Sequence, residues 1–327
     1  MKKKKRIAIV VVGLIVLIFG VCIWWFLSQQ DNKLSGNYKE SESKNYIEYG
    51  DKKYKYNEHL SNYLFLGIDT REPVETNEGR SNAGQSDAIM LVSYDRVKKT
   101  AICLTIPRDT MTNVQIITPD GTDIGKGKEQ ITLQYAYGDG KHKSCELTKA
   151  AVSEMLYGVP IQGYCSVNMD GIPIAVGQVG SVDVVVPNSS LEEVNSIYKE
   201  GATVTITQEN AEEFVRYRDV KKGFSAMDRL ERQRAFANAF GKVAQEKAKK
   251  DSDFVISMYE NLEPYMVTNI GTDVFVKLAE AKGNISEEIK NIPGEKVDGI
   301  EFDEYHINET QLFELILQMF YEEVQED

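Results

Sequence analysis

A charge-free apolar run near the N-terminus constrains the topology of this chain. It covers residues 7–27 and follows five basic residues at positions 2–6. A helix over this run would be about 31 Å long, and the core of a bilayer is about 30 Å thick. Basic residues before a span hold the N-terminus in the cytoplasm, and Trp24 and Trp25 suit the opposite interface. We therefore expect a single-pass anchor in the cell membrane, with the C-terminal part outside the cytoplasm.

A cleavable signal peptide is the alternative to an anchor. It requires a shorter apolar core and a cleavage site with small residues, and the sequence WWFLS at 24–28 offers no such site. The uncleaved anchor is therefore favoured. The predicted organisation is a cytoplasmic tip at 1–6, the anchor at 7–27, an extracytoplasmic stalk at 28–58 that is poor in aliphatic residues, and one domain at 59–327.

The charge and the motifs exclude several classes of function. A formal net charge of −12 argues against a nucleic-acid partner, because nucleic acid needs a basic face. The chain has no nucleotide-binding glycine loop, serine elbow or H-E-x-x-H helix. Residues 121–127 are glycine-rich but match no nucleotide loop, so we expect a surface excursion there. Any phosphate that is transferred must already be activated as a diphosphate.

Strands and helices alternate along the chain, which is typical of a layered α/β domain. The apolar segments 88–94 and 101–106 are joined by a short polar turn and predict an antiparallel hairpin. The expected strands lie at 62–68, 88–94, 101–106, 162–167, 182–186 and 297–302, and the expected helices lie at 131–137, 146–156, 169–177, 208–215, 227–247 and 309–324, with two more between 251 and 283.

The cysteines leave two alternatives open. Cys22 lies in the predicted anchor and Cys103 in a predicted strand, so that Cys145 and Cys165 remain. An oxidising exterior permits a disulfide between them. Buried free thiols are the simpler alternative, and no C-x-x-C spacing indicates a metal site.

Four polar clusters lie at or near the ends of apolar runs. They are Asp-Thr-Arg at 69–71, Ser-Asp at 86–87, Arg-Asp at 108–109, and the arginine-rich segment 216–232. Ligands of open α/β sheets bind outside the strand ends. One such cluster is usually only solvated surface. Four together indicate a site for an anion, because arginine binds phosphate through a planar, two-pronged group.

The spacing of the arginines adds detail. Arg229 and Arg232 are three residues apart on a predicted helix and share one side of it, so that with Gln233 they are predicted to bind one phosphate. Arg216 and Arg218 are two residues apart and converge only on extended chain, which requires the preceding helix to end before them. A charged helix face, paired with neighbouring acids, is the alternative for the first pair.

Carboxylates accompany these arginines. Asp69 and Asp87 are predicted to hold Mg²⁺, a hard ion that shares oxygen ligands with substrate phosphates. Simple ion pairs with neighbouring arginines are the alternative. Asp109 is predicted as a general base, and an ion pair with Arg108 is an equally good interpretation.

These segments, in this order, resemble the LytR-CpsA-Psr family of cell-envelope proteins. The resemblance runs from about Tyr63 to the last helix, and a basic tip with one membrane span also occurs in the family. The segments that carry it are FLGIDTR at 65–71, SDAIMLV at 86–92, IPRDT at 106–110, LQYAYG at 133–138, VGSVDV at 179–184, FVRYR at 214–218 and RLERQR at 229–234.

The resemblance implies a Mg²⁺-dependent phosphotransferase that moves a glycan from a polyprenyl diphosphate carrier to peptidoglycan through a phosphodiester. It also implies a three-layer α/β/α sandwich around a mixed sheet, with an apolar tunnel for the lipid tail. The predicted diphosphate-binding residues are Arg71, Arg108, Arg216, Arg218, Arg229, Arg232 and Gln233. The predicted catalytic residues are Arg108, Asp109, Arg216 and Arg218, and the predicted metal ligands are Asp69 and Asp87.

The chain departs from the family pattern at three places. A long polar segment leaves open whether Arg80 takes the usual arginine place before Ser-Asp. Ala226 stands where the family usually has an aspartate, with Asp228 as the nearest substitute, and Ser181 replaces a common glycine. A lipid diphosphate hydrolase and a non-catalytic sensor of lipid carriers or envelope regulator are the alternative functions, and the glycan that is carried is not specified.

Overall fold

The computed structural model describes residues 38–40, 46–71, 83–219, 221–223, 225–281, 289–299 and 302–324. The predicted anchor and Arg80 lie outside these residues. Among the described residues, no helix combines the length and the apolar character that a membrane crossing requires. The chain divides into two compact units, a small unit (Met1–Asn57 with Phe320–Asp327) and a main unit (Glu58–Met319).

The small unit contains a four-stranded antiparallel sheet. Its strands, in spatial order, are β1 (Tyr38–Glu40), β2 (Tyr46–Tyr49), β3 (Lys52–Tyr56) and β16 (Tyr321–Glu323). The described part of the predicted stalk therefore forms strands, and the predicted helix at 309–324 gives way to a strand after Phe320. Tyrosines supply the apolar area that aliphatic residues lack, since the rings of Tyr56 and Tyr321 meet edge to face at 5.6 Å.

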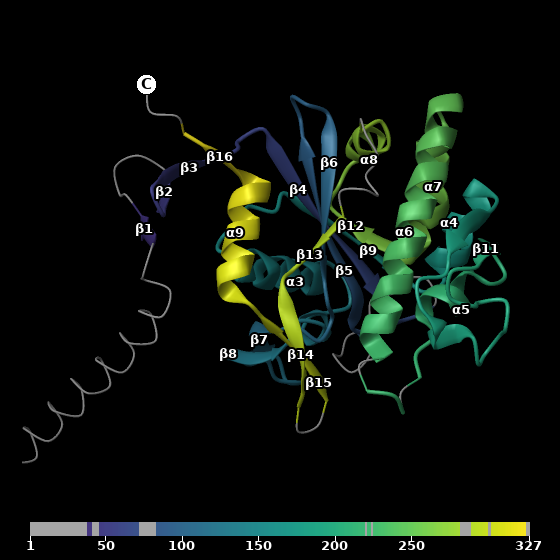
Figure 1. Ribbon diagram of the computed structural model, residues 1–327, viewed down its shortest axis with the longest axis horizontal. Helices are drawn as coiled ribbons and strands as arrows, with labels where there is room; N and C mark the ends of the chain where they lie inside the picture. Colours follow the sequence, from purple (N-terminus) through teal and green to yellow (C-terminus); the bar gives the residue numbers. More distant parts are fainter. Residues whose placement is uncertain are drawn as a thin grey trace, which may run out of the picture. The chain divides into compact units, whose positions relative to one another are not determined.

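A mixed six-stranded sheet forms the centre of the main unit (Figure 1). Its strands, in spatial order, are β12 (Met266–Thr268), β9 (Gly163–Asn168), β4 (Leu60–Ile68), β5 (Ser86–Asp95), β6 (Thr100–Ile106) and β13 (Ile289–Asn291). The β4–β9 and β6–β13 pairs are parallel and the other three are antiparallel. The predicted α/β class, the mixed sheet and the β5–β6 hairpin are confirmed.

Helices lie on both faces of this sheet. Neighbouring residues of β9 show the two faces, because side chains alternate along a strand. Ser166 contacts Tyr135 and Cys145, which belong to α2 (Leu133–Ala136) and α3 (His142–Met155). Cys165 packs in a cluster with side chains of α7 (Phe254–Leu262) and α8 (Thr272–Ala279). Side chains of β4 and β9 are therefore buried between helices on either side.

The other elements extend from this core. They are β7 (Met111–Ile117), β8 (Asp123–Gln130), α4 (Gly171–Val179), β10 (Val182–Val185), η2 (Ser189–Leu191), β11 (Thr203–Ile206), α5 (Ala211–Arg216), α6 (Ser225–Lys250), η3 (Glu263–Tyr265), β14 (Gly294–Asp298), β15 (Asp303–Ile307) and α9 (Glu309–Phe320). Residues 121–127, predicted as a surface excursion, are mostly exposed, and most of them belong to β8, which pairs with β7. The single strand predicted at 297–302 is instead a hairpin of β14 and β15.

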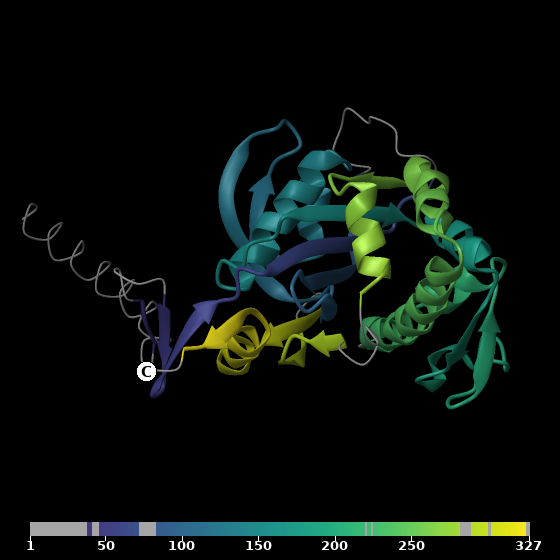
Figure 2. The same cartoon turned by 90° about the horizontal axis from the view of Figure 1, so that it is seen from above.

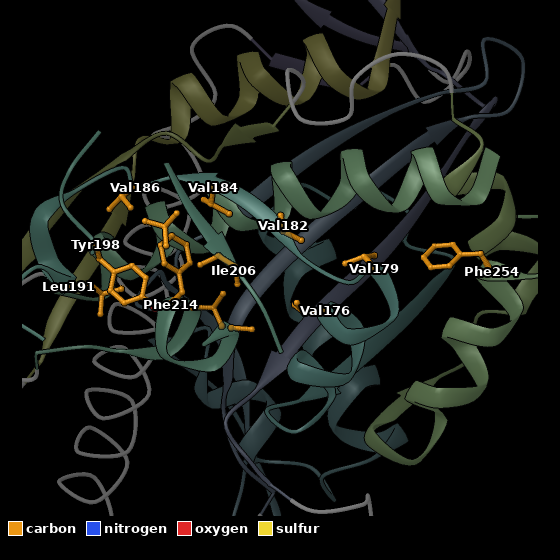
Figure 3. Packing of buried hydrophobic residues seen from close by; sticks show 13 residues of the cluster. Val176, Val179, Val182, Val184, Val186, Leu191, Tyr198, Ile206, Phe214 and Phe254 are labelled. Carbon is orange, nitrogen blue, oxygen red and sulfur yellow. The ribbon is translucent and has the colours of Figure 1, made fainter. Parts of the chain in front are cut away.

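A second apolar core lies beside the long helix α6. It joins α6 to the lobe, which we define as residues 182–216 and which contains β10, η2, β11 and α5 (Figure 2). Tyr198 and Phe214 are fully buried there and pack with their ring centroids 5.6 Å apart, among the valines that Figure 3 labels. The lobe ends at Arg216, so this core fixes the end of α5 relative to α6.

The three described cysteines are free thiols, and all of them are buried. Burial raises the pKa of the thiols of Cys103, Cys145 and Cys165 to about 12. The Cys145 thiol donates a hydrogen bond to Ser166 at 3.5 Å. Of the two alternatives for Cys145 and Cys165, the structure shows buried thiols rather than a disulfide.

Replacement of Phe214 by alanine should destabilise the chain by about 3–5 kcal/mol, because the buried ring leaves a cavity in the second core. Chemical denaturation would measure this loss. Val185→Ala is the matched control: its side chain belongs to the same lobe but is 59% exposed, and we expect a change within about 0.5 kcal/mol. Equal losses for the two variants would contradict the assignment of this core.

Candidate functional site

One buried carboxylate holds two arginines together. Asp87, near the start of β5, accepts a hydrogen bond from Arg108 on one oxygen and from Arg229 on the other, the second at 2.7 Å. The side chains of Arg108, Asp87 and Arg229 are only 15%, 9% and 6% exposed. The shared carboxylate keeps two guanidinium groups together whose charges would otherwise repel each other.

Gln85 connects this pair to Asp69. Its side-chain oxygen accepts a hydrogen bond from Arg108 at 2.6 Å, while its backbone N–H donates to the Asp69 carboxylate at 2.5 Å. The Asp69 N–H in turn donates to the Gln85 carbonyl at 3.1 Å. The sequence offered no chemical reason to select Gln85; only its place directly before the Ser86–Asp87 pair could have drawn attention to it.

The exposed arginines form a second group around Glu212. This carboxylate accepts hydrogen bonds from Arg71 and, at 2.9 Å, from Arg216. Arg71 also donates to Asp170 at 3.0 Å. The Arg218 Nε donates to the Ser225 hydroxyl at 3.0 Å. Glu212 was not among the predicted residues, although its position one turn before Arg216 on α5 is a common spacing for an ion pair.

Two adjoining cavities meet at these side chains. The polar pocket has a volume of about 530 Å³ and is lined by Asp69, Asp87, Val194, Glu212, Glu213, Arg216, Tyr217, Arg218 and Arg229. The apolar cavity has a volume of about 210 Å³, and its lining is mostly apolar, including Ile68, Ile89, Met90, Met169, Ile172, Leu230 and Phe236. Asp87, Arg216 and Arg229 line both, and Gln233 lines the apolar cavity.

Arg216 and Arg218 therefore reach the same pocket, but not in the way predicted. The helix α5 includes Arg216 instead of ending before it, and Tyr217, with φ −48° and ψ 136°, leaves the helical conformation. Arg216 pairs with Glu212 along α5, while Arg218 lies beyond the helix end.

Arg232 lies apart from both cavities. It is 1% exposed and donates to the Ser190 hydroxyl at 3.1 Å and to the carbonyl of Tyr217. Burial, with a smaller contribution from the nearby charge of Arg229, lowers the pKa of Arg232 to about 10. The structure thus separates Arg229 and Arg232, which the helical spacing had assigned to one phosphate.

Two nitrogens of Arg229 have no hydrogen-bond partner among the described residues. Burial lowers its pKa, and the neighbouring Asp87 opposes that effect. Its Nε and Nη2 are buried and have no hydrogen-bond partner among the described residues. Buried polar groups are normally satisfied, so these two nitrogens are suited to an anionic ligand that enters the polar pocket.

Asp109 is buried beside Arg108, with 3.3 Å between its carboxylate and the arginine Nε. Burial raises the pKa of Asp109, although the positive charges of Arg108, Arg218 and Arg229 act in the opposite direction. Asp109 lines neither cavity as the structure describes them.

Asp69 and Asp87 face one pocket and fit Mg²⁺ only in combination with a substrate. The described residues contain no group of three or more acidic, histidine or cysteine side chains that would form a metal site by themselves. Mg²⁺ is often held by one or two carboxylates together with substrate phosphates. Both oxygens of Asp87 already bind arginines, so phosphate oxygens would have to supply most of the ligands.

Asp87→Asn should reduce the free energy of unfolding by about 3–5 kcal/mol, because it leaves two buried guanidinium groups without their shared counter-charge. Denaturant titration would measure the loss. Asp69→Asn is the control: Asp69 is exposed, and we expect a loss below about 1 kcal/mol. A loss of that small size for Asp87→Asn would show that the shared carboxylate does not hold the arginines together.

The pH dependence of stability should show the raised pKa of Asp109. Because its pKa in the folded chain is raised from 3.8, the folded state binds more protons than the unfolded state between these two values. Stability therefore falls as the pH rises through this window. The difference in unfolding free energy between the native chain and Asp109→Asn should shrink with rising pH and then level off. A difference that grows would mean that the arginines outweigh burial.

This chain resembles two known transferases in sequence. It is 30% identical over 181 residues to the polyisoprenyl-teichoic acid–peptidoglycan teichoic acid transferase TagV of Bacillus subtilis (strain 168), a match that covers 54% of this chain and 41% of that protein. It is 26% identical over 269 residues to the transferase TagT of the same organism, covering 81% of this chain and 76% of TagT.

A comparison of folds gives a relative of the same kind. A solved structure of TagT bound to LI-WTA superposes with a TM-score of 0.59 at 22% identity, covering 80% of this chain and 90% of that one. This likeness establishes the fold alone. The model of the LytR_cpsA_psr family matches residues 25–320, which include all of the predicted site residues. The chain therefore belongs to the LytR_cpsA_psr family.

Proposed function

We propose that this chain transfers a phosphoglycan from a polyprenyl diphosphate carrier to peptidoglycan. The observation that carries the proposal is the junction of the two cavities, where Asp87 holds two arginines between a polar pocket and an apolar one. A lipid diphosphate has this same division into a charged head and an apolar tail. Relatives named as teichoic acid transferases favour teichoic acid as the glycan.

The polar and charged residues would have separate roles in binding the lipid diphosphate. Arg216, Arg218 and Arg229, which line the polar pocket, would hold the diphosphate. Arg108 lines neither cavity as described and would reach the diphosphate from its place on the other oxygen of Asp87. The apolar cavity would take the first part of the lipid tail. Arg71 would act through Glu212, to which Arg216 is also bound. Gln233, in the wall of the apolar cavity, would contact the end of the lipid nearest the phosphates. The apolar run at 7–27 would hold the chain in the membrane, with this site on its extracytoplasmic side.

The reaction needs one displacement at phosphorus. A hydroxyl oxygen of peptidoglycan attacks the phosphorus that carries the glycan, and the bond from this phosphorus to the bridging oxygen breaks. Polyprenyl phosphate leaves, and a phosphodiester joins glycan and peptidoglycan. The arginines stabilise charge on the phosphate oxygens in the transition state. Mg²⁺, held by Asp69 and Asp87, would add positive charge at the same oxygens.

The proton of the attacking hydroxyl needs an acceptor. Asp109 was predicted for this role, but it lines neither cavity, so we propose that it orients Arg108 instead. Glu212 and Glu213 are the carboxylates of the polar pocket that the metal does not require. One of them would accept the proton, directly or through water.

Incubation of the full-length chain with labelled lipid-linked glycan and peptidoglycan oligomers tests this function. Transfer predicts a labelled phosphodiester on peptidoglycan that is lost when Mg²⁺ is chelated. Release of glycan phosphate to water alone would establish a hydrolase. Binding of the lipid without turnover would favour a sensor of lipid carriers.

Arg216→Ala and Arg218→Ala should each reduce kcat/KM by about a hundredfold or more, as loss of a group that stabilises transition-state charge does. Neither side chain is fully buried, so the melting temperature should move by only about 2 °C. Lys277→Ala is the control. The exposed Lys277 side chain pairs with the nearby Asp273, far along the chain from Arg216 and Arg218, and this variant should retain full activity. A melting temperature that falls as steeply as the rate would show that these arginines are structural.

A further inference from the structure

Both terminal nitrogens of Arg232 are engaged by the protein itself. One donates to the Ser190 hydroxyl and the other to the Tyr217 carbonyl, while the buried Nε has no hydrogen-bond partner among the described residues. With 1% exposure Arg232 is the largest of the fully buried side chains among the described residues. It lines neither the polar pocket nor the apolar cavity. A phosphate in the polar pocket would therefore not reach this guanidinium.

The positions of the two acceptors show which parts of the chain Arg232 connects. Tyr217 stands between Arg216 and Arg218, and its extended conformation ends α5. Ser190 lies in η2 and donates to Asn188, which in turn donates to the carbonyl of Asp228 and to the carboxylate of Glu231 on α6. The start of α6 is thus bound to the lobe and to the residue between two pocket arginines.

Arginine is suited to this task because its rigid, planar group can reach two acceptors at once. Lysine carries the same charge but offers a single point. Burial of the charge is unfavourable in itself, so the contacts to Ser190 and Tyr217 must offset it. Arg229, three residues earlier on α6, differs because its terminal Nη2 has no partner among the described residues and because it lines both cavities.

We propose that Arg232 is a positioning residue: it fixes the backbone between Arg216 and Arg218 by binding the Tyr217 carbonyl, and it does not contact the diphosphate. The identity of the ligand that Arg216 and Arg218 bind rests on the proposed function. The contact of Arg232 with Tyr217 does not rest on that function, so it can be tested separately.

A double-mutant cycle separates an indirect effect from a direct contact, because residues that act through one another are not additive. The probe is inorganic diphosphate with Mg²⁺, titrated into the full-length chain in detergent micelles. Arg232→Gln should weaken binding about tenfold, a change of about 1.4 kcal/mol. In a chain that already carries Arg216→Ala and Arg218→Ala, the same change should weaken binding less than twofold.

Arg229→Gln is the matched control, on the same helix and close to Arg232. As a direct contact, it should weaken binding by a similar factor in both backgrounds. The same full loss in both backgrounds for Arg232→Gln would overturn the proposal, because Arg232 would then contribute independently of Arg216 and Arg218.

Hydrogen exchange tests the contact between Arg232 and the Tyr217 carbonyl without any ligand. Amides in peptides that cover residues 214–219 should exchange faster in Arg232→Gln than in the native chain, and should be unchanged in Arg229→Gln. Unchanged exchange in Arg232→Gln would overturn the proposal. If that variant does not fold, Arg232→Lys, which retains the charge and one contact, serves in its place. A native chain that binds no diphosphate would refute the proposed function, while exchange would still decide the role of Arg232.

Discussion

The shared carboxylate of Asp87 is the interaction on which the site depends. It draws together Arg108, which follows β6, and Arg229, which belongs to α6. The central sheet and the long helix are thereby joined at one buried point. A second carboxylate, Asp109, lies 3.3 Å from the Nε of Arg108, so charge alone does not distinguish this cluster from a structural ion-pair network. Arg229 does, because its Nε and Nη2 are buried without a hydrogen-bond partner among the described residues and its side chain lines both cavities.

Much of the fold was predictable from the sequence, since strong patterns determine it. Long apolar runs predicted β4, β5 and β6, and the short polar turn between the last two predicted their antiparallel pairing, which the structure shows. Elements with weak patterns were missed. The strand β8 is rich in glycine and lysine and is held mainly by its pairing with β7. The small sheet uses tyrosines where a search for aliphatic residues finds only Ile47 in its described strands. In both cases the partner strand, which a local pattern cannot show, stabilises the element.

The convergence of the candidate residues was predictable only in part. Polar residues at strand ends come together, so Asp69, Asp87 and Arg108 lie close to one another, whereas Gln85, which links them, was not selected. Helical spacing placed Arg229 and Arg232 on one side of α6, but it could not show that they bind different partners. Arg229 binds Asp87 and lines both cavities, while Arg232 binds Ser190 and the Tyr217 carbonyl. These partners are properties of the packed chain and are not contained in the spacing.

Space for an apolar ligand follows from two small residues at one register position. Gly67 on β4 pairs with Ala88 on β5, and both line the apolar cavity. A Cβ atom on Gly67 would lie 3.1 Å from that of Ala88, which is tighter than most Cβ contacts. Larger residues at this pair would fill the end of the cavity beside Asp87. The sheet thus leaves an apolar space next to the polar pocket, and the proposed lipid diphosphate would occupy the two cavities together.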